Sequence, residues 1–309
     1  MWGRFARRIP RVSTDMEALH TGDGDALELH HLAPAKAESP RLLMLHGLEG
    51  TRESHYVGGF FARARDRGWG ATLLVFRGCG AQPNVARRFY HSGETEDLDF
   101  VFKTLRQRDP GARWLVAGVS LGGNVLLKWL GERGPVARAD VVAAAAVSVP
   151  FDLEAGARSI ARGFSRVYDR SFLKSLRQKA LTKLERIPGL FDRDRLERAR
   201  TVFEFDDCVT APVHGFADAR DYYARSSSQR FLADIRIPTL LLSAEDDPFL
   251  PADVLRQVGV ASAQNANLTV EFHPRGGHVG FVGGAWPWRA RYYAENRVFA
   301  FFDEAMESR

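Results

Sequence analysis

Short runs of consecutive apolar residues recur along most of the chain. They lie at residues 42–45, 71–76, 114–119, 141–149, 239–242 and 268–272. Strands that are apolar on both faces are typical of a parallel sheet that is covered on both sides. We therefore predict that these runs are strands of such a sheet.

Amphipathic segments separate the runs. Residues 95–108 carry apolar side chains at positions i, i+3, i+4 and i+7 counted from Leu98, which is the spacing of one helix face. Residues 121–132 and 290–307 are predicted as further helices. Strands that alternate with helices predict an α/β fold, with a mostly parallel central sheet flanked by helices on both faces.

Two stretches depart from this alternation. Residues 16–33 form two alternating runs around the turn-forming residues 22–25, and they predict a β-hairpin. Residues 151–232 contain no convincing strand, but they are rich in arginine and have an amphipathic helical pattern. We interpret them as a helical insertion between two strands of the sheet.

Composition narrows the class of protein. The chain has 309 residues, of which 45% are hydrophobic and 26% charged, so it can bury a full core. This excludes intrinsically disordered and fibrous proteins. With 43 basic and 38 acidic residues, the net charge is +5. Such a charge permits an anionic partner but is too small to predict nucleic-acid binding.

Three features bear on the cellular compartment. The two cysteines, Cys79 and Cys208, fit a reducing compartment and are interpreted as packed small residues. The longest apolar run, residues 141–149, is about half as long as a membrane-spanning helix needs to be. The arginine-rich residues 1–15 lack the apolar core of a secretory signal. The sequence therefore predicts a soluble, cytoplasmic protein.

The strongest chemical signal is a G-x-S-x-G motif at residues 118–122, centred on Ser120. It follows an apolar run and opens a predicted helix, which is the context of a nucleophile elbow. The neighbours two positions away from the serine must be small, so that the backbone can pass through the sharp strand-to-helix turn. Ser120 is therefore predicted as the nucleophile.

A serine hydroxyl needs a base that takes its proton. His278 is the strongest of nine histidines because it lies on the glycine-flanked loop 275–280, after the last predicted strand. His273, at the end of that strand, is a weaker candidate. The other histidines considered are interpreted as surface or packing residues: His30, His31, His55 and His214.

The base in turn needs a carboxylate that holds its tautomer. Asp246 and Asp247 follow the run 239–242, at the carboxyl end of a predicted parallel strand, where side chains face the site crevice. We predict that Asp247, directly before Pro248, is the acid and that Asp246 is a turn or supporting residue. Asp152 is a weaker alternative, and a purely capping role for Asp246 and Asp247 stays open.

The order of nucleophile, acid and base along the chain is that of the α/β-hydrolases. Because these residues lie on both sides of residues 151–232, we predict one domain over residues 1–309 with 151–232 as its helical lid. Two backbone N–H groups are predicted as the oxyanion hole, those of Leu121 and Leu48. His46 is predicted to brace the loop that carries Leu48.

Further segments match a known family. They are residues 46–50, 76–80, 91–95, 122–126, 206–207, 244–249 and 276–281. On these segments the chain resembles the YheT-like (EMB-type) branch of the α/β-hydrolases, which includes abhydrolase-domain lipases. The resemblance runs from about residue 17 to the end of the chain. It implies a carboxylic ester hydrolase with Ser120, Asp247 and His278 as its charge relay, and ester or acyl-lipid substrates.

The sequence therefore predicts a serine hydrolase of the α/β-hydrolase fold that cleaves carboxylic esters through an acyl-enzyme. No zinc, dinucleotide or phosphate-loop motif is present, so no cofactor is predicted. A thioesterase, amidase or acyltransferase on the same triad is an alternative. Another is a non-catalytic lipid-binding protein. In either class, the basic residues 1–15 and 151–232 are candidates for contact with a membrane surface.

Overall fold

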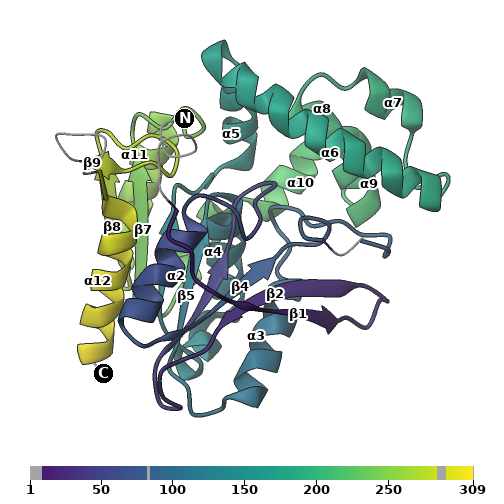
Figure 1. The fold of residues 1–309 in the computed structure, drawn as a ribbon. Coiled ribbons are helices and arrows are strands. Elements are labelled where there is room, and N and C mark those ends of the chain that lie inside the picture. Colours follow the sequence, from purple (N-terminus) through teal and green to yellow (C-terminus); the bar gives the residue numbers. More distant parts are fainter. Residues whose placement is uncertain (1–8, 82–83, 284–289, 309) are drawn as a thin grey trace.

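The computed structural model describes residues 9–81, 84–283 and 290–308. Its main sheet consists of β1 (Asp15–His20), β2 (Ala26–Leu32), β3 (Arg41–Leu45), β4 (Gly70–Val75), β5 (Trp114–Val119), β6 (Val141–Val147), β7 (Thr239–Ala244) and β8 (Leu268–His273). The strands lie in the order β1-β2-β4-β3-β5-β6-β7-β8 (Figure 1). β1 pairs antiparallel with β2, and β2 with β4, whereas all pairs from β4 to β8 are parallel.

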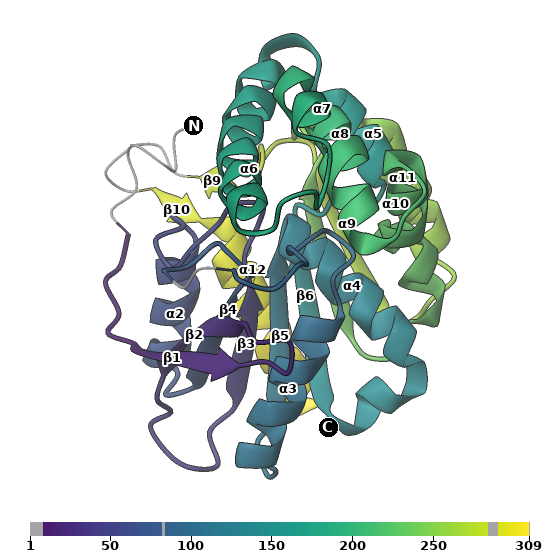
Figure 2. The ribbon, with the colours of Figure 1, turned by 90° about the vertical axis from the view of Figure 1, so that its right-hand side faces the viewer.

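Helices cover both faces of this sheet (Figure 2). They are α2 (Val57–Asp66), α3 (Glu96–Arg108), α4 (Leu121–Arg133), η1 (Gly134–Ala139), α11 (Ala252–Ser262) and α12 (Tyr293–Glu307). On one face the rings of Phe60 in α2 and Phe299 in α12 lie 6.0 Å apart. On the other, the rings of Phe102 in α3 and Trp129 in α4 lie 5.1 Å apart. The predicted α/β fold is confirmed.

β5 and β6 lie in the middle of the sheet, and every residue of both strands is buried. β5 has the limits that its apolar run predicted. β6 ends at Val147, two residues before the end of the apolar run. The extended backbone is interrupted at Ser148, which adopts a φ of 53°, while its N–H still donates to the carbonyl of Leu242 in β7.

The two ends of the chain were predicted with different success. The predicted hairpin is confirmed, because β1 and β2 pair from Asp15↔His31 to His20↔Ala26. The prediction of a helix from residue 290 is wrong at its start. β10 (Arg291–Tyr292) pairs there with β9 (Val282–Gly283), and α12 begins only at Tyr293. Residues 284–289 lie outside the described part of the chain.

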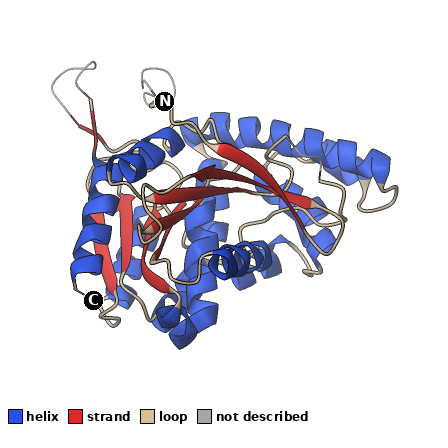
Figure 3. Ribbon diagram, turned by 60° about the horizontal axis from the view of Figure 1, so that its bottom comes forward, coloured by secondary structure: helices blue, strands red, loops and turns tan. Residues whose placement is uncertain are grey.

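The segment between β6 and β7, described throughout, forms helices and no strand, as predicted for residues 151–232. Its helices are α5 (Leu153–Ile160), η2 (Gly163–Ser165), α6 (Arg166–Arg186), α7 (Arg193–Arg198), α8 (Val202–Phe205), η3 (Asp206–Thr210), α9 (Ala211–His214), α10 (Ala219–Ser226) and η4 (Ser228–Asp234). In Figure 2 the long α6 lies beyond the ends of the strands, and Figure 3 shows the strands of the sheet enclosed by helices. Although α6 has 21 residues, no helix in the described ranges is long and apolar enough to cross a membrane.

Candidate active site

Ser120 occupies the sharp turn between β5 and α4. Its φ of 54° and ψ of −120° lie in a region that L-residues rarely adopt, and the turn is held by hydrogen bonds at both ends. The Ser120 N–H donates to the Val147 carbonyl on β6 at 2.8 Å, and the Ser120 carbonyl accepts the Asn124 N–H at 3.1 Å. The strained backbone is the geometry expected of a nucleophile elbow.

The glycines on either side of Ser120 leave no room for a side chain. A Cβ at Gly118 would lie 2.4 Å from the Gly122 carbonyl oxygen, and a Cβ at Gly122 would lie 2.5 Å from that of His46. These contacts explain why the motif needs glycine at both positions: backbone atoms, which cannot move aside cheaply, fill the space.

Gly122→Ala is expected to lower the free energy of unfolding by about 3 kcal/mol, because the added methyl group overlaps a buried backbone oxygen. Urea denaturation measures this change. The matched control is Gly259→Ala in α11, where no atom lies within 4 Å of the new Cβ. This control is expected to raise stability by about 0.5–1 kcal/mol through helix propensity. Equal effects of the two substitutions would contradict the explanation.

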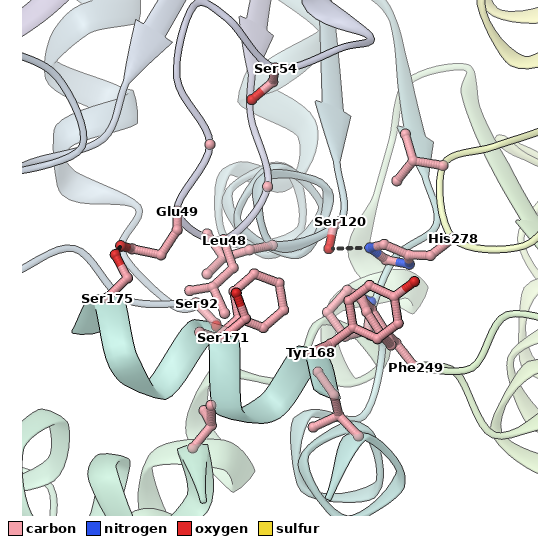
Figure 4. A pocket seen from close by; sticks show the side chains of 18 of the residues that line it. Leu48, Glu49, Ser54, Ser92, Ser120, Tyr168, Ser171, Ser175, Phe249 and His278 are labelled. Carbon is pink, nitrogen blue, oxygen red and sulfur yellow. Dashed lines mark hydrogen bonds between the residues drawn. The ribbon is translucent and has the colours of Figure 1, made fainter. Parts of the chain in front are cut away.

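His278 joins Ser120 to Asp247 through two hydrogen bonds, and Figure 4 shows the one to Ser120. Its Nε2 lies 3.0 Å from Ser120 Oγ, and its Nδ1 lies 2.7 Å from Asp247 Oδ2. An ionised Asp247 can only accept, so Nδ1 carries the proton and Nε2 is left free to accept the serine hydroxyl. The fully buried Asp247 side chain also accepts the Phe249 N–H at 2.9 Å. The structure thus brings the three predicted residues together in the predicted order.

The loop that carries His278 is fastened on both sides of the imidazole. Asp246 accepts the N–H groups of Gly276 and Gly277 at 2.8 and 2.7 Å, which matches its interpretation as a supporting residue. On the other side, the Val279 N–H donates to Ser148 Oγ at 3.2 Å. Sequence reasoning missed Ser148, because nothing in its sequence context marks a serine that leaves a strand with positive φ.

The other carboxylate and histidine candidates have other partners. Asp152 accepts the Ala155 N–H at 3.0 Å and caps α5, so it is not the acid next to His278. His273 packs its ring against Tyr293 at 5.0 Å. His214 packs against His91 at 4.4 Å, and burial lowers the pKa of His214 to about 4. These positions agree with the minor roles that the sequence indicated.

The loop between β3 and α2 passes directly beside the serine. A Cβ at Gly47 would lie 3.2 Å from Ser120 Cβ. The Gly47 carbonyl accepts the Gly50 N–H at 2.9 Å and hydrogen-bonds to His46 Nδ1 at 2.7 Å. In a trans peptide the N–H points opposite to the carbonyl, so these bonds fix the direction of the Leu48 N–H. Leu48 and Leu121, the first residue of α4, both line the cleft above Ser120.

His46 braces this loop as a neutral ring. It is fully buried, with Nδ1 donating to the Gly47 carbonyl and Nε2 accepting the Phe76 N–H at 3.0 Å. Burial lowers the pKa of His46 to about 4, which keeps the Nε2 lone pair available near neutral pH. The geometry fits the predicted bracing role and leaves no contact that a second base would need.

Other residues of the matching sequence segments hold the surrounding fold. The fully buried Arg77 forms hydrogen bonds of 2.6 and 2.8 Å to Asp97 at the start of α3. Asn124 in α4 donates to the carbonyls of Ser92 and Ser226. The Arg77 bonds join the loop after β4 to α3. The Asn124 bonds join the loop before α3, and the last residue of α10, to the helix that begins at the elbow.

The buried thiols are poorly suited to serve as nucleophiles. Burial raises the pKa of Cys79 to about 12 and that of Cys208 to about 11, so both thiols stay protonated near pH 7. This agrees with their interpretation as packed residues. Over the described ranges, no group of three or more histidine, cysteine or carboxylate side chains could hold a metal ion.

A cleft of about 1810 Å³ opens over Ser120 and His278. Helix α6 forms one wall, with Tyr168, Ser171 and Ser175 facing the cleft (Figure 4). Near His278 the wall is aromatic, because Phe249 lies 4.3 Å from the imidazole and 5.0 Å from the Tyr168 ring. Sequence reasoning did not find these wall residues, because their position depends on how α6 packs over the sheet.

Comparisons with known proteins identify the family of the chain. A family model described as the alpha/beta hydrolase fold matches residues 40–285. The putative esterase YheT of Escherichia coli (strain K12) is 40% identical over 288 residues, which cover 92% of this chain and 83% of that protein. Phospholipase ABHD3 of Mus musculus is 31% identical over 311 residues, which cover 98% of this chain and 74% of that protein.

Among solved structures, the esterase Pf2001 of Pyrococcus furiosus matches with a TM-score of 0.59 at 16% identity. The match covers 94% of this chain and 92% of that one, and it supports the fold. The chain therefore belongs to the α/β hydrolase fold family, in the branch that contains YheT. The predicted family and the broader class of esterase-like hydrolases are confirmed.

Proposed function

We propose that the protein hydrolyses carboxylic esters through an acyl-enzyme on Ser120. The observation that carries the proposal is the hydrogen-bonded chain from Ser120 through His278 to the buried Asp247. Ser120 and His278 face a large cleft. The names of the relatives, esterase and phospholipase, support an ester as the substrate.

The proposed reaction has two halves. In the first, His278 Nε2 takes the hydroxyl proton while Ser120 Oγ forms a bond to the ester carbonyl carbon, whose oxygen becomes an oxyanion. The N–H groups of Leu48 and Leu121 stabilise this oxyanion. The carbon–oxygen bond to the alcohol then breaks, and His278 gives its proton to the leaving alcohol. In the second half, water repeats the attack and releases the acid, while Asp247 stabilises the imidazolium.

We further propose that residues 1–309 form one catalytic domain and that residues 151–232 are its lid. β6 and β7 are neighbours that pair from Ala144↔Thr239 to Val147↔Leu242, so the chain leaves and re-enters the same sheet at adjacent strands. Ser120 precedes the segment, and Asp247 and His278 follow it. The wall that α6 contributes to the cleft supports a role in admitting substrate.

A fluorophosphonate probe tests the proposal without knowledge of the natural substrate. Such probes form a covalent bond to an activated serine, so wild-type protein is expected to be labelled at Ser120 and the Ser120→Ala variant to stay unlabelled. Mass spectrometry of the labelled peptide locates the site. Folded wild-type protein that takes no label would favour the lipid-binding alternative, whereas a panel of ester, thioester and amide substrates would separate the alternative acyl-transfer activities.

We propose as well that the mouth of the cleft docks on an anionic phospholipid surface. Ile9, Val167 and Val282 line the cleft and are also exposed, by 40%, 53% and 38%. Phe164, three residues before Val167, is 70% exposed. The stretch that contains Phe164 and Val167 also carries exposed basic side chains: Arg162, Arg166 and Arg170. Apolar side chains with basic neighbours are the combination that binds anionic lipid surfaces.

Flotation with vesicles tests this docking. The protein is expected to float with vesicles of phosphatidylcholine and phosphatidylglycerol, and the double variant Phe164→Ser/Val167→Ser to bind them at least about tenfold more weakly. The control is Val136→Ser/Val260→Ser, two residues exposed by 64% and 73% outside the cleft lining. Equal binding by both variants would contradict the proposal. Sedimentation velocity tests whether these side chains form a protein interface instead. If the wild-type protein and the control variant were dimers and Phe164→Ser/Val167→Ser were a monomer, this result would also contradict the proposal.

A further inference from the structure

Glu49 directly follows Leu48 and adopts an uncommon backbone conformation for its residue type. The Gly50 N–H donates to the Gly47 carbonyl, so residues 47–50 form a β-turn with Glu49 at its third position. The φ of Glu49 is 55°, as a type II turn requires at that position. Glycine or asparagine usually occupies this position, because a larger side chain costs about 1–2 kcal/mol in the left-handed region. Some other contact must therefore hold Glu49 there.

The contacts that hold Glu49 come from both the core and α6. Tyr90 accepts the Glu49 N–H at 3.0 Å, and its hydroxyl donates to Glu49 Oε1 at 2.7 Å. From α6, Lys179 Nζ donates to Oε1 at 2.8 Å and Ser175 Oγ donates to Oε2 (Figure 4). The Glu49 side chain is only 10% exposed, so these charged and polar contacts are shielded from water.

The position of this turn matters for the oxyanion. The turn carries the Leu48 N–H, one of the two proposed donors, and it lies beside Ser120. A donor in an oxyanion hole acts only if it already points at the place where the negative charge develops. Whatever fixes the backbone of residues 47–50 therefore affects the transition state more than the binding of the substrate.

Helix α6 also has an attachment to the core that does not involve Glu49. Lys183 Nζ donates to the carbonyls of Ala86 and Arg88 at 2.7 and 2.8 Å, and it lies 4.0 Å from the centre of the Phe89 ring. Loss of the contacts to Glu49 is therefore not expected to release α6 from the core. Its effect would be confined to the turn.

We propose that Glu49 is a positioning residue through which α6 sets the oxyanion hole. Ser175 and Lys179 on the proposed lid bind the Glu49 carboxylate. The bound carboxylate stabilises the turn of residues 47–50, in which Glu49 has a positive φ. This turn keeps the Leu48 N–H in place.

The bonds from His46 and Tyr90 hold part of the turn from the core, and the contacts from α6 complete its support. The position of the lid and the efficiency of the oxyanion hole are therefore coupled. This inference rests on the proposed esterase function for its kinetic consequence.

The test removes the contacts from the α6 side. Ser175→Ala/Lys179→Met is expected to lower kcat for a short-chain aryl ester by about tenfold, with KM nearly unchanged, because a donor is displaced rather than lost. Affinity for a short alkyl trifluoromethyl ketone, whose adduct with Ser120 carries an oxyanion, is expected to fall by the same factor. The control is Lys174→Met, an exposed lysine on the same helix, which is expected to keep wild-type kinetics.

Two substitutions of Glu49 itself separate positioning from simple attachment of the lid. Glu49→Ala loses the carboxylate and keeps the strain, so kcat is expected to fall by up to about 10²-fold. Glu49→Gly also loses the carboxylate, but it accommodates the positive φ and is expected to recover part of that loss. Equal losses in the two variants, or unchanged kcat in Ser175→Ala/Lys179→Met, would overturn the proposal.

Hydrogen–deuterium exchange keeps this inference distinct from the proposed function. The Gly50 amide, which closes the turn, is expected to exchange at least tenfold faster in Ser175→Ala/Lys179→Met than in wild-type protein or Lys174→Met. Faster exchange would support the positioning role whatever the activity of the protein. A lack of both turnover and labelling in the wild-type protein would contradict only the esterase function. Unchanged exchange in folded variants would overturn the positioning role.

Discussion

Replacing Ser120 with alanine is expected to lower kcat for hydrolysis of a short-chain p-nitrophenyl ester by about 10⁴- to 10⁶-fold. In the proposed reaction the hydroxyl oxygen forms the acyl bond, and it is activated through its hydrogen bond of 3.0 Å to His278 Nε2. Neither buried thiol can substitute, because burial keeps both Cys79 and Cys208 protonated. The residual rate would come from the oxyanion donors and the cleft acting on water.

Initial rates over a range of ester concentrations give this loss, and thermal denaturation shows whether the variant is folded. The matched control is Ser171→Ala, because Ser171 faces the same cleft from α6 (Figure 4). This control is expected to keep kcat within about threefold of wild type, a change of less than 1 kcal/mol in activation free energy. A folded Ser120→Ala variant with wild-type turnover would show that the hydrolysis does not use this serine.

The parts of the fold that were predicted well are those whose signal is local. β5 is apolar on both faces and fully buried, so its apolar run and its observed limits coincide at residues 114–119. The elbow was predicted for a similar reason. Glycine is required at positions 118 and 122 by close contacts within the turn itself and with the adjacent loop. The G-x-S-x-G motif therefore indicates the sharp turn directly.

The parts that escaped prediction depend on contacts between distant residues. Ser148 ends β6 early and supports the His278 loop, but its role appears only when Val279, 131 positions away, is placed beside it. Glu49 is a clearer case. Turn statistics alone argue against glutamate at a positive φ, and only the tertiary contacts to Ser175 and Lys179, 126 and 130 positions away, explain the residue.

The second large effect is expected at Asp247, the carboxylate preferred on sequence grounds. Asp247→Asn is expected to lower kcat by about 10³- to 10⁴-fold with little change in KM. Asparagine keeps the size of the side chain and can still accept the Phe249 N–H, so the fold is preserved. Its amide, however, donates to His278 Nδ1. The imidazole proton then lies on Nε2, and this nitrogen can no longer accept the hydroxyl proton of Ser120.

Two matched substitutions make this a test of the choice among the three candidate carboxylates. Asp246→Asn keeps the acceptor for the Gly276 and Gly277 N–H groups, so kcat is expected to change by less than about tenfold. Asp152→Asn keeps the cap of α5, since asparagine caps as well as aspartate, and kcat is expected to be unchanged. Because only Asp247 touches His278, the loss should follow that contact. A larger loss in Asp246→Asn or Asp152→Asn would mean that the hydrogen bond between Asp247 and His278 is not what orients the base.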